Sequence, residues 1–372
     1  MSPTDSSAAV SDREQKILGI IEKTRAKRPR FKVDQVTMAH GAGGKSTQTM
    51  IEGLFLPAFA PDDAEAEGLA ALADAGSVVV DGTGLAMTTD SFVVKPLRFP
   101  GGSIGELAVN GTVNDLAMAG AKPQALTVAM ILEEGLRADV LREEVEAIAA
   151  AARAADVEIV AGDTKVVERG HCDGMYITTT GVGMVDPRAA LSPANLRPGD
   201  KVLVSGPIGE HGTAIMLARD EFQLDAEIVS DTQPLWPAAN ALLGAAGEGL
   251  RCMRDATRGG VATVLNELAR ASGVAIVARE ADVPVRPDVM GAAEILGIDP
   301  MYVANEGRLV AFVAPEAAAD ALEALRAVTG SEGAAEIGEV KTDPPGMVLV
   351  ETAFGGKRVM DLLAGDPLPR IC

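Results

Sequence analysis

The chain has 372 residues, 47% of them hydrophobic and 23% charged, a balance typical of a globular protein long enough for about two domains. Its formal net charge of -20 argues against nucleic acid as a partner, because an acidic surface repels a polyanionic backbone. The apolar runs are too short for a membrane span and the N-terminus lacks a secretory signal, so we expect a cytoplasmic protein whose 3 cysteines stay reduced.

The pattern along the chain predicts two domains flanked by terminal extensions. Residues 1–32 are predicted to be an N-terminal extension, with a short helix followed by a basic, proline-broken stretch. Beyond it the sequence has the pattern of a mixed α+β fold. A turn signal at Asn195–Asp200 separates an N-terminal domain (33–194) from a C-terminal domain (195–364). Residues 365–372 are a tail that prolines prevent from continuing a helix.

Strands are predicted at short apolar runs, and helices where apolar residues recur at helical spacing. The predicted strands are Ser77–Val80, Leu85–Thr89, Leu126–Leu132, Glu158–Ala161, Tyr176–Val185, Lys201–Ser205 and Leu309–Val313. The predicted helices are Ser103–Gly120, Ala138–Ala154, a helix through Val261 and Leu268 that closes at Gly273, and Pro315–Val328. A capping box formed by Ser103 and Glu106 is expected to start the first of these helices.

The segment His40-Gly-Ala-Gly-Gly-Lys-Ser46 is close to a phosphate-binding loop. A Walker A motif needs a glycine five residues before Gly44, however, and Ala39 stands at that position. A glycine-rich segment followed by a lysine can still lie over phosphates. Taken alone, the segment is equally compatible with phosphate binding and with a flexible turn.

Four aspartates lie at or near predicted element ends or helix turns: Asp90, Asp115, Asp163 and Asp255. Asp163 is expected to follow its strand, and Asp255 stands at the mouth of a helix whose unpaired N–H groups could face an anion. Hard cations such as Mg²⁺ take oxygen ligands, usually one or two carboxylates together with substrate phosphates. Taken singly, most such aspartates are turn or cap residues, and the set as a whole is the stronger indication of a cation site.

Two further residues have the chemistry of reacting groups. Glu306 lies between Asn305 and Gly307 in an apolar stretch and is a candidate general base, although a tight turn explains it more simply. Cys372 is the final residue. The Pro-Arg-Ile segment before it could let the cysteine enter a pocket and also reach another protein. Arg370 would partly offset the terminal carboxylate, which otherwise disfavours the thiolate. From chemistry alone, an incidental terminal thiol is the simpler interpretation.

Together these segments resemble the HypE family of hydrogenase maturation proteins, the carbamoyl dehydratases, within the ATP-binding superfamily of aminoimidazole ribonucleotide synthetase. The resemblance runs from about Val36 to Cys372. The segments that carry it are His40–Lys45, Thr89–Val94, Phe99–Gly102, Asn110–Met118, Gly162–Lys165, Gly209–Gly212, Arg254–Gly260, Leu296–Pro300, Ala304–Gly307 and Pro369–Cys372. Several are shared across the superfamily, whereas the terminal Pro-Arg-Ile-Cys is specific to this family.

The resemblance implies a two-domain aminoimidazole-ribonucleotide-synthetase-like fold with a flexible C-terminal tail. It implies an enzyme that uses ATP and Mg²⁺ to dehydrate a carbamoyl group on Cys372 to a thiocyanate. A carbamoyltransferase, HypF, would load that group, and a HypC–HypD scaffold would receive the cyanide for the iron of a [NiFe]-hydrogenase. It also implies a homodimer formed by the N-terminal domains, with ATP bound between the N- and C-terminal domains.

The resemblance also assigns roles to individual residues. The implied catalytic residues are Cys372 as carrier, Glu306 as the base for the nitrogen proton, Lys165 near the phosphoryl group, and His211 as an oriented polar group. The implied nucleotide-binding residues are Gly41, Gly43, Gly44, Lys45, Asp90, Asn114, Asp163, Thr164 and Arg258. The implied Mg²⁺ ligands are Asp90, Asp115, Asp163 and Asp255.

Two other functions stay open at this point. The first is that of selenophosphate synthetase or of another small-molecule ATP-dependent phosphoryl transferase of the same superfamily. Selenophosphate synthetases usually carry cysteine or selenocysteine in the glycine-rich loop, and His40–Ser46 has neither. The other members give no reason for a terminal Pro-Arg-Ile-Cys. A non-catalytic, ATP-sensing scaffold would keep the fold but tolerate Glu306→Gln and Lys165→Ala.

Overall fold

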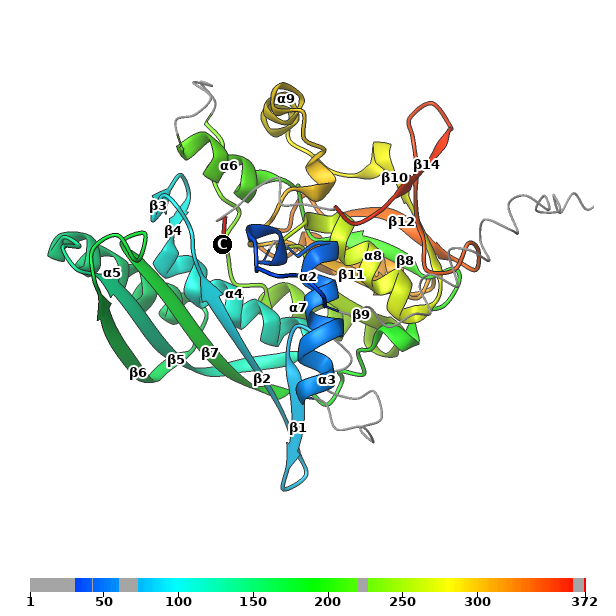
Figure 1. Cartoon of the computed structure of the whole chain (residues 1–372). Coiled ribbons are helices and arrows are strands. Elements are labelled where there is room, and N and C mark those ends of the chain that lie inside the picture. Colours follow the sequence, from blue (N-terminus) through cyan, green and yellow to red (C-terminus); the bar gives the residue numbers. More distant parts are fainter. Residues whose placement is uncertain (1–30, 42, 60–72, 220–226, 364–370) are drawn as a thin grey trace, which may run out of the picture.

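The computed structural model contains two large sheets with helices packed against them, and the C-terminus lies between the two halves (Figure 1). The residues that it describes are 31–41, 43–59, 73–219, 227–363 and 371–372. Most of the predicted N-terminal extension and Arg370 therefore lie outside the described residues.

The N-terminal sheet has five strands in the order β1-β2-β7-β5-β6. Its strands are β1 (Gly76–Val80), β2 (Thr83–Phe92), β5 (Ala121–Glu133), β6 (Glu158–Val167) and β7 (Met175–Val185). All neighbouring pairs are antiparallel except β5 and β6, which run parallel. The crossover between the two parallel strands is α5 (Ala138–Ala154), as a parallel connection requires.

The C-terminal sheet has seven strands in the order β14-β13-β10-β12-β8-β11-β9. Its strands are β8 (Lys201–Val204), β9 (Leu250–Asp255), β10 (Ala275–Arg279), β11 (Leu309–Val313), β12 (Ala335–Lys341), β13 (Val348–Glu351) and β14 (Lys357–Met360). The helices of this half are α6 (Glu210–Ala218), α7 (Trp236–Ala246), α8 (Gly260–Ser272), α9 (Pro287–Leu296) and α10 (Ala318–Arg326). The short elements at the start of the described chain are η1 (Met38–Gly41), α2 (Lys45–Met50), η2 (Ile51–Phe55) and α3 (Leu56–Phe59), and a small hairpin joins β3 (Arg98–Phe99) to β4 (Gly102–Ser103).

Helix α4 (Ile104–Met118) is shared by the two halves of the molecule. It packs on β2, β5, β7 and α5 on one side and on β9 and α7 on the other. Leu107 belongs to the N-terminal core, whereas Met118 belongs to a core built mainly from the C-terminal half. A helix that is apolar on all sides is expected to be buried, and α4 is buried along almost its whole length. The expected capping box does not form as predicted, because the Ser103 side chain makes no capping hydrogen bond.

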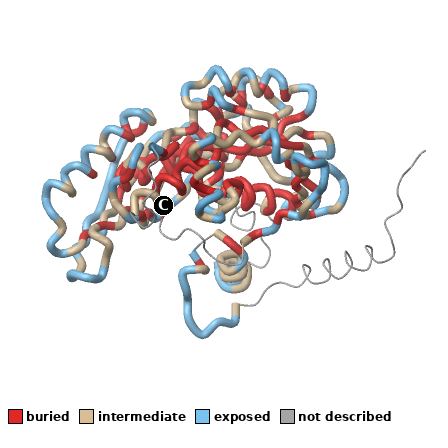
Figure 2. Tube along the Cα trace, turned by 90° about the horizontal axis from the view of Figure 1, so that it is seen from above, coloured by how far each residue is buried: buried red, intermediate tan, exposed pale blue. Residues whose placement is uncertain are grey.

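The second face of the N-terminal sheet has a different character. Cross-strand partners share a face, so the register places Met87, Ile131 and Met184 on the side opposite α4. All three side chains are exposed. The end of the molecule that carries this sheet and α5 lies at the left of Figure 2 and is largely coloured as exposed. We call the side opposite α4 the open face. Asp163 and Lys165 are the register partners of Ala129 and Ile131 and therefore lie on the open face as well.

Several predicted elements are confirmed, and several predicted boundaries are wrong. Helix α5 and strand β11 have the predicted bounds, and α8 ends where Gly273 takes a left-handed φ of 68°. Strand β2 continues past Thr89 to Phe92, so Asp90 lies within the strand and not after it, and β5 begins five residues before Leu126. Helix α10 is shorter at both ends than the predicted Pro315–Val328. Strand β6 does not end at Ala161 as predicted but continues to Val167, because it keeps pairing with β5. Within the described residues, no helix is both long and apolar enough to cross a bilayer.

Candidate active site

A small pocket of about 190 Å³ gathers residues from both halves of the chain. Its lining comprises Asp74, Asp90, Ser91, Phe92, Gly111, Asp115, Asp255, Thr257, Arg258, Glu306 and Cys372. Strand β2 supplies Asp90, the shared helix α4 supplies Asp115, and the end of β9 supplies Asp255. The pocket thus brings together six of the residues predicted from the sequence: Asp90, Asp115, Asp255, Arg258, Glu306 and Cys372.

Three carboxylates in the pocket form a potential cation site. One carboxylate oxygen from each of Asp74, Asp115 and Asp255 lies within 4.8 Å of the other two. Burial, followed by repulsion from Asp90 and neighbouring carboxylates, holds the pKa of Asp115 well above its usual range. Burial and the charges on Asp74 and Asp90 raise the pKa of Asp255 in the same way. Oxygen ligands that repel one another fit Mg²⁺, whose charge would offset that repulsion.

Asp74 is the site residue that the sequence reasoning missed. It belongs to no motif and stands two residues before the start of β1. In the structure its carboxylate forms an ion pair with Arg254 and also faces Asp115 and Asp255. The sequence did contain one signal for Asp74. It is an acidic residue just before β1, and the next strand, β2, carries Asp90.

Glu306 lies in the turn before β11 and is 2% exposed. Burial raises its pKa well above the usual range, with further increases from Asp255 and Asp231. Its backbone N–H donates to Asp231 Oδ1 at 3.1 Å, which fixes the turn. Within the described residues, Glu306 Oε1 is buried without a hydrogen-bond partner. An unsatisfied carboxylate oxygen with a raised pKa has the properties of a proton acceptor.

The last two residues are docked inside the molecule, next to the pocket. The Val93 N–H donates to the Cys372 carbonyl oxygen at 3.1 Å, and His211 Nε2 lies 2.6 Å from the Ile371 carbonyl oxygen. The Ile371 side chain is 4% exposed and belongs to the N-terminal core. The charge on Cys372 is the largest of the causes that raise the pKa of Arg258. The chain terminus therefore sits beside the acids as part of the pocket wall.

The glycine-rich segment lies over Arg258, at the edge of the pocket. Arg258 donates to the Gly41 carbonyl oxygen at 3.2 Å. Gly43 has a φ of 77°, and a Cβ atom there would come within 3.1 Å of the Arg258 Cβ, so glycine is required on both counts. Gly44 caps α2, and Lys45 Nζ pairs with Asp361 Oδ2 at 2.7 Å, beside the base of the tail. In this structure Lys45 therefore contacts Asp361, four residues before the tail begins.

Asn114 holds the two halves together. Its amide nitrogen donates to the carbonyl oxygens of Gln233 and Glu306, at 3.0 and 3.2 Å. Its Oδ1 accepts from the Leu235 N–H at 2.7 Å. The side chain is buried, and these backbone partners satisfy it on both ends. In this structure Asn114 braces the turn that carries Glu306.

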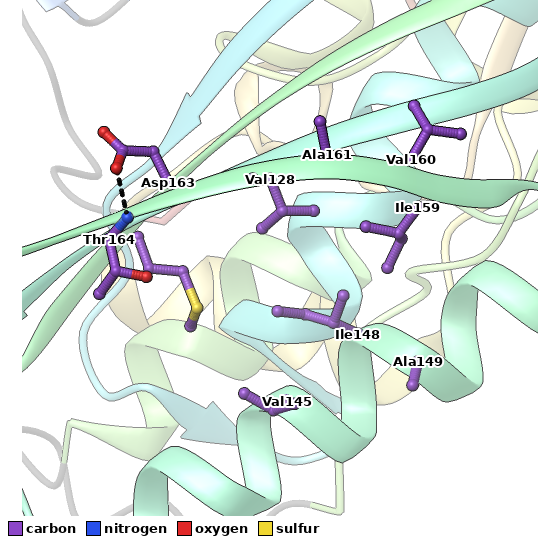
Figure 3. Close-up of a pocket in the computed structure, with 11 residues that line it drawn as sticks. Val128, Val145, Ile148, Ala149, Ile159, Val160, Ala161, Asp163 and Thr164 are labelled. Carbon is purple, nitrogen blue, oxygen red and sulfur yellow. Dashed lines mark hydrogen bonds between the residues drawn. The ribbon is translucent and has the colours of Figure 1, made fainter.

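Asp163, Thr164 and Lys165 are not brought to this pocket. They lie in β6, at the edge of the sheet, where Lys165 Nζ pairs with Asp163. Asp163 and Lys165 lie on the open face, whereas Asp90 lies on the face that α4 covers. Thr164 and Asp163 border a separate pocket of about 610 Å³ between β6 and α5, whose other walls are apolar (Figure 3). The sequence did not reveal that these residues lie apart from the pocket, because the strand was predicted to end at Ala161 and they were expected in the loop after it.

Comparisons with known proteins agree on one family. Residues 72–185 match the AIR synthase related protein N-terminal domain, and residues 197–350 match its C-terminal domain. The chain is 49% identical over 337 residues to the carbamoyl dehydratase HypE of Bradyrhizobium diazoefficiens, a match that covers 91% of this chain and 96% of that protein.

Two solved structures are similar over most of the chain. A crystal structure of a HypE–HypF complex shares 44% identity, covers 84% of this chain and 99% of that chain, and superposes with a TM-score of 0.79. A crystal structure of the hydrogenase maturation protein HypE in complex with ATP shares 43% identity, covers 91% and 100%, and has a TM-score of 0.75. At this identity and coverage, the two-domain chain belongs to the HypE carbamoyl dehydratases of the AIR synthase related family.

Proposed function

We propose that this protein uses ATP to dehydrate a carbamoyl group on its own Cys372 to a thiocyanate, for the cyanide ligands of a [NiFe]-hydrogenase. The observation that carries the proposal is the docked terminus, which places Cys372 in one pocket with Glu306 and the acid cluster. Its relatives are named carbamoyl dehydratases, and one of them has been crystallised with ATP. A covalent carrier that enters such a pocket presents its substrate at a fixed position.

The proposed chemistry balances in two steps. The carbamoyl oxygen on Cys372 attacks the γ-phosphorus of ATP, the bond to ADP breaks, and the nitrogen loses one proton. The carbon–oxygen bond then breaks, phosphate leaves with that oxygen, and the second nitrogen proton is lost, which leaves S–C≡N. The sum converts carbamoyl-Cys372 and ATP into cyanated Cys372, ADP, phosphate and a proton.

The charged residues of the pocket have distinct tasks in this scheme. Glu306 is the base that accepts a nitrogen proton, since its Oε1 has no competing hydrogen bond among the described residues. Arg258, between the tail and the glycine-rich segment, would hold negative charge that develops there. Asp74, Asp115 and Asp255, with Asp90 beside them, would hold Mg²⁺, which supplies charge neutralisation for phosphates.

The competing functions account for less of the structure. A selenophosphate synthetase would not need a terminal cysteine docked against Glu306. A scaffold that only senses ATP would not need a buried carboxylate with an unsatisfied oxygen, which costs stability. Dehydration of a group carried on Cys372 requires both the docked terminal cysteine and the buried carboxylate of Glu306.

The proposal includes partners and a compartment. A HypF carbamoyltransferase would load Cys372, because a relative has been crystallised in complex with HypF. A HypC–HypD scaffold would receive the cyanide. The cytoplasm is the proposed location, because the carrier thiol must stay reduced to be carbamoylated.

Mass spectrometry of the C-terminal peptide tests the function. We expect that incubation with HypF, carbamoyl phosphate and MgATP adds a carbamoyl group to Cys372, and that this adduct becomes one water lighter only while ATP is hydrolysed. Cys372→Ser should remove both signals, and Cys172 in the same chain serves as the internal thiol control. If HypF is shown to be active in the same mixture and Cys372 stays unmodified, Cys372 is not the carrier. A small-molecule phosphoryl transferase would then be the better interpretation.

The open face supports a homodimer as a further part of the proposal. Val78, Met87, Ile131 and Met184 are all exposed on one side of the N-terminal sheet. The same face also carries hydroxyl pairs between Thr89 and Thr180 and between Ser91 and Thr178. An uncovered sheet face with this many large exposed apolar side chains is unusual in a monomer, and a second copy of the same face would cover them. Lys165 and Asp163 would then lie at the subunit boundary, which would give them a setting that the single chain does not provide.

Met87→Lys is expected to break this dimer, because the ammonium group would be buried in the interface without a partner, at a cost of about 2–5 kcal/mol. Sedimentation equilibrium should then give a dimer for the unmodified protein and mainly monomer for the variant. Val359→Lys, a similarly exposed position on β14 of the other half, is the matched control and should stay dimeric. If Met87→Lys and Val359→Lys show the same proportion of dimer, the dimer interface does not lie on the open face.

A further inference from the structure

We propose that His211 and Ser230 form a latch that positions the chain's own C-terminal dipeptide, Ile371–Cys372, in the pocket. This inference rests on the proposed carrier role of Cys372 and deepens it by assigning the residues that hold the carrier in register. His211 contacts the backbone one residue before the thiol, so it is a positioning residue. The site recognises a peptide carbonyl and an apolar side chain, and not the carbamoyl group.

The hydrogen bonds fix the orientation of the imidazole ring. A carbonyl oxygen only accepts, so His211 Nε2 must carry the hydrogen that bonds to the Ile371 carbonyl oxygen at 2.6 Å. His211 Nδ1 is then the acceptor, and the Ser230 hydroxyl 2.8 Å away must donate to it. Ser230 Oγ is itself held by the Thr232 N–H at 3.2 Å. The chain of bonds selects one neutral tautomer and aims its N–H at the tail.

His211 is well suited to a fixed role and poorly suited to proton transfer. It is fully buried, and its ring packs nearly perpendicular to the Phe99 ring, with ring centroids 5.5 Å apart and an angle of 86° between the ring planes. Burial lowers its pKa to about 4, so the ring stays neutral near neutral pH. The Nε2–H donor is therefore present under working conditions without titration.

Two hydrogen bonds join the backbone segment that carries His211 to the turn that carries the base. The Gly209 N–H donates to Asn305 Oδ1 at 2.7 Å, and the Gly212 N–H donates to the Ala304 carbonyl oxygen at 3.0 Å. These two bonds flank His211 in the first turn of α6 and join it to the turn that carries Glu306. The position of the tail and the position of the base are therefore coupled through these two hydrogen bonds.

Three contacts together set the register of the terminus. His211 holds the Ile371 carbonyl from the C-terminal half, and Val93 holds the Cys372 carbonyl from the N-terminal half. The buried Ile371 side chain supplies the third contact. Because successive carbonyls point to different sides, a shift of one residue would break both hydrogen bonds at once. Only this register brings the final side chain to the acid cluster.

Thiol alkylation of the full-length protein without nucleotide tests the latch. Limiting iodoacetamide followed by peptide mass spectrometry reads all three cysteines in one sample. Cys172 is partly exposed and reports the reagent, whereas Cys252 is 4% exposed and reports global unfolding. We expect His211→Leu to raise the Cys372-to-Cys172 labelling ratio by about 2- to 10-fold, the range for losing one neutral hydrogen bond. The substitution leaves the charge near the thiol unchanged, because His211 is already neutral.

His211→Gln, which can still donate an N–H, should restore much of the protection and serves as the matched variant. If His211→Leu also exposes Cys252 to labelling, that variant is unfolding globally, and Ser230→Ala then provides the test, with a smaller rise in the same ratio expected. An unchanged ratio in a folded variant would overturn the latch. The measurement needs neither ATP nor HypF, so its failure is separate from failure of the dehydratase reaction.

Discussion

Glu306→Gln is expected to lower the rate of Cys372 cyanation by about 100- to 10,000-fold, the usual contribution of a positioned general base. The amide keeps the size of the side chain and removes its ability to take a proton from the carbamoyl nitrogen. ATP affinity should stay close to that of the unmodified protein, since Glu306 is held by Asp231 and Asn114 through its backbone. The measurement is single-turnover cyanation of preloaded protein, with nucleotide affinity determined separately.

The pH dependence of the same reaction gives a second observable. Burial raises the pKa of Glu306 well above its usual range, so the ionised base becomes populated only as the pH rises through that raised value. The rate should increase over that interval in the unmodified protein and lose this rise in Glu306→Gln. Glu306→Asp, which keeps a carboxylate but shortens the reach, should fall between the two. Wild-type cyanation by Glu306→Gln would show that another group takes the proton.

Asp115→Asn is expected to make the metal-free protein more stable at neutral pH while removing its response to Mg²⁺. The folded state raises the pKa of Asp115, chiefly by burial and then by the charges on Asp90 and Asp255. A carboxyl group with a raised folded pKa contributes stability below its unfolded pKa, and that stability is lost as the pH rises through the folded pKa. At neutral pH the carboxyl group is ionised in the unfolded chain, so burying it costs stability in the folded state, and the amide should return about 1–2 kcal/mol.

Urea unfolding with and without Mg²⁺ separates the two effects of Asp115→Asn. Mg²⁺ should stabilise the unmodified protein, because a ligand that binds only the folded state adds stability by mass action. The variant should show little of this gain, and its advantage in metal-free buffer should shrink at acidic pH. Glu323→Gln, which removes an exposed charge from α10, is the control and should leave the Mg²⁺ response intact. A variant that is destabilised without metal and still responds to Mg²⁺ would contradict the cation site.

Local pattern was sufficient to predict α5, which packs on one side only. Helix α5 has one buried stripe and solvent on its other face, and its predicted bounds agree with the structure. Helix α4 was found by its apolar content, but its burial in two cores depends on the C-terminal sheet, which no local window contains. The length of β6 depends in the same way on its parallel partner β5.

The site was predictable to the extent that its residues belong to motifs. Asp90, Asp115, Asp255, Glu306 and Cys372 were singled out and do meet in one pocket. Asp74 was missed because its role comes from long-range contact with the other acids. The separation of Lys165 from this group follows from strand register, where a difference of one residue decides which face a side chain takes.

The anchoring of the tail at its root limits how far its thiol can travel. The Leu363 carbonyl oxygen accepts from the Lys45 N–H at 3.2 Å, and Cys372 is nine residues further along the chain. A fully extended chain spans at most about 3.6 Å per residue, so the thiol moves within a sphere of roughly 30 Å around that anchor. Any enzyme that loads the carrier, and any acceptor that unloads it, must place its reacting atoms inside the same sphere. Donor and acceptor both need the same single thiol and cannot hold it at the same time, so the order of their visits would be set by exclusion as much as by affinity.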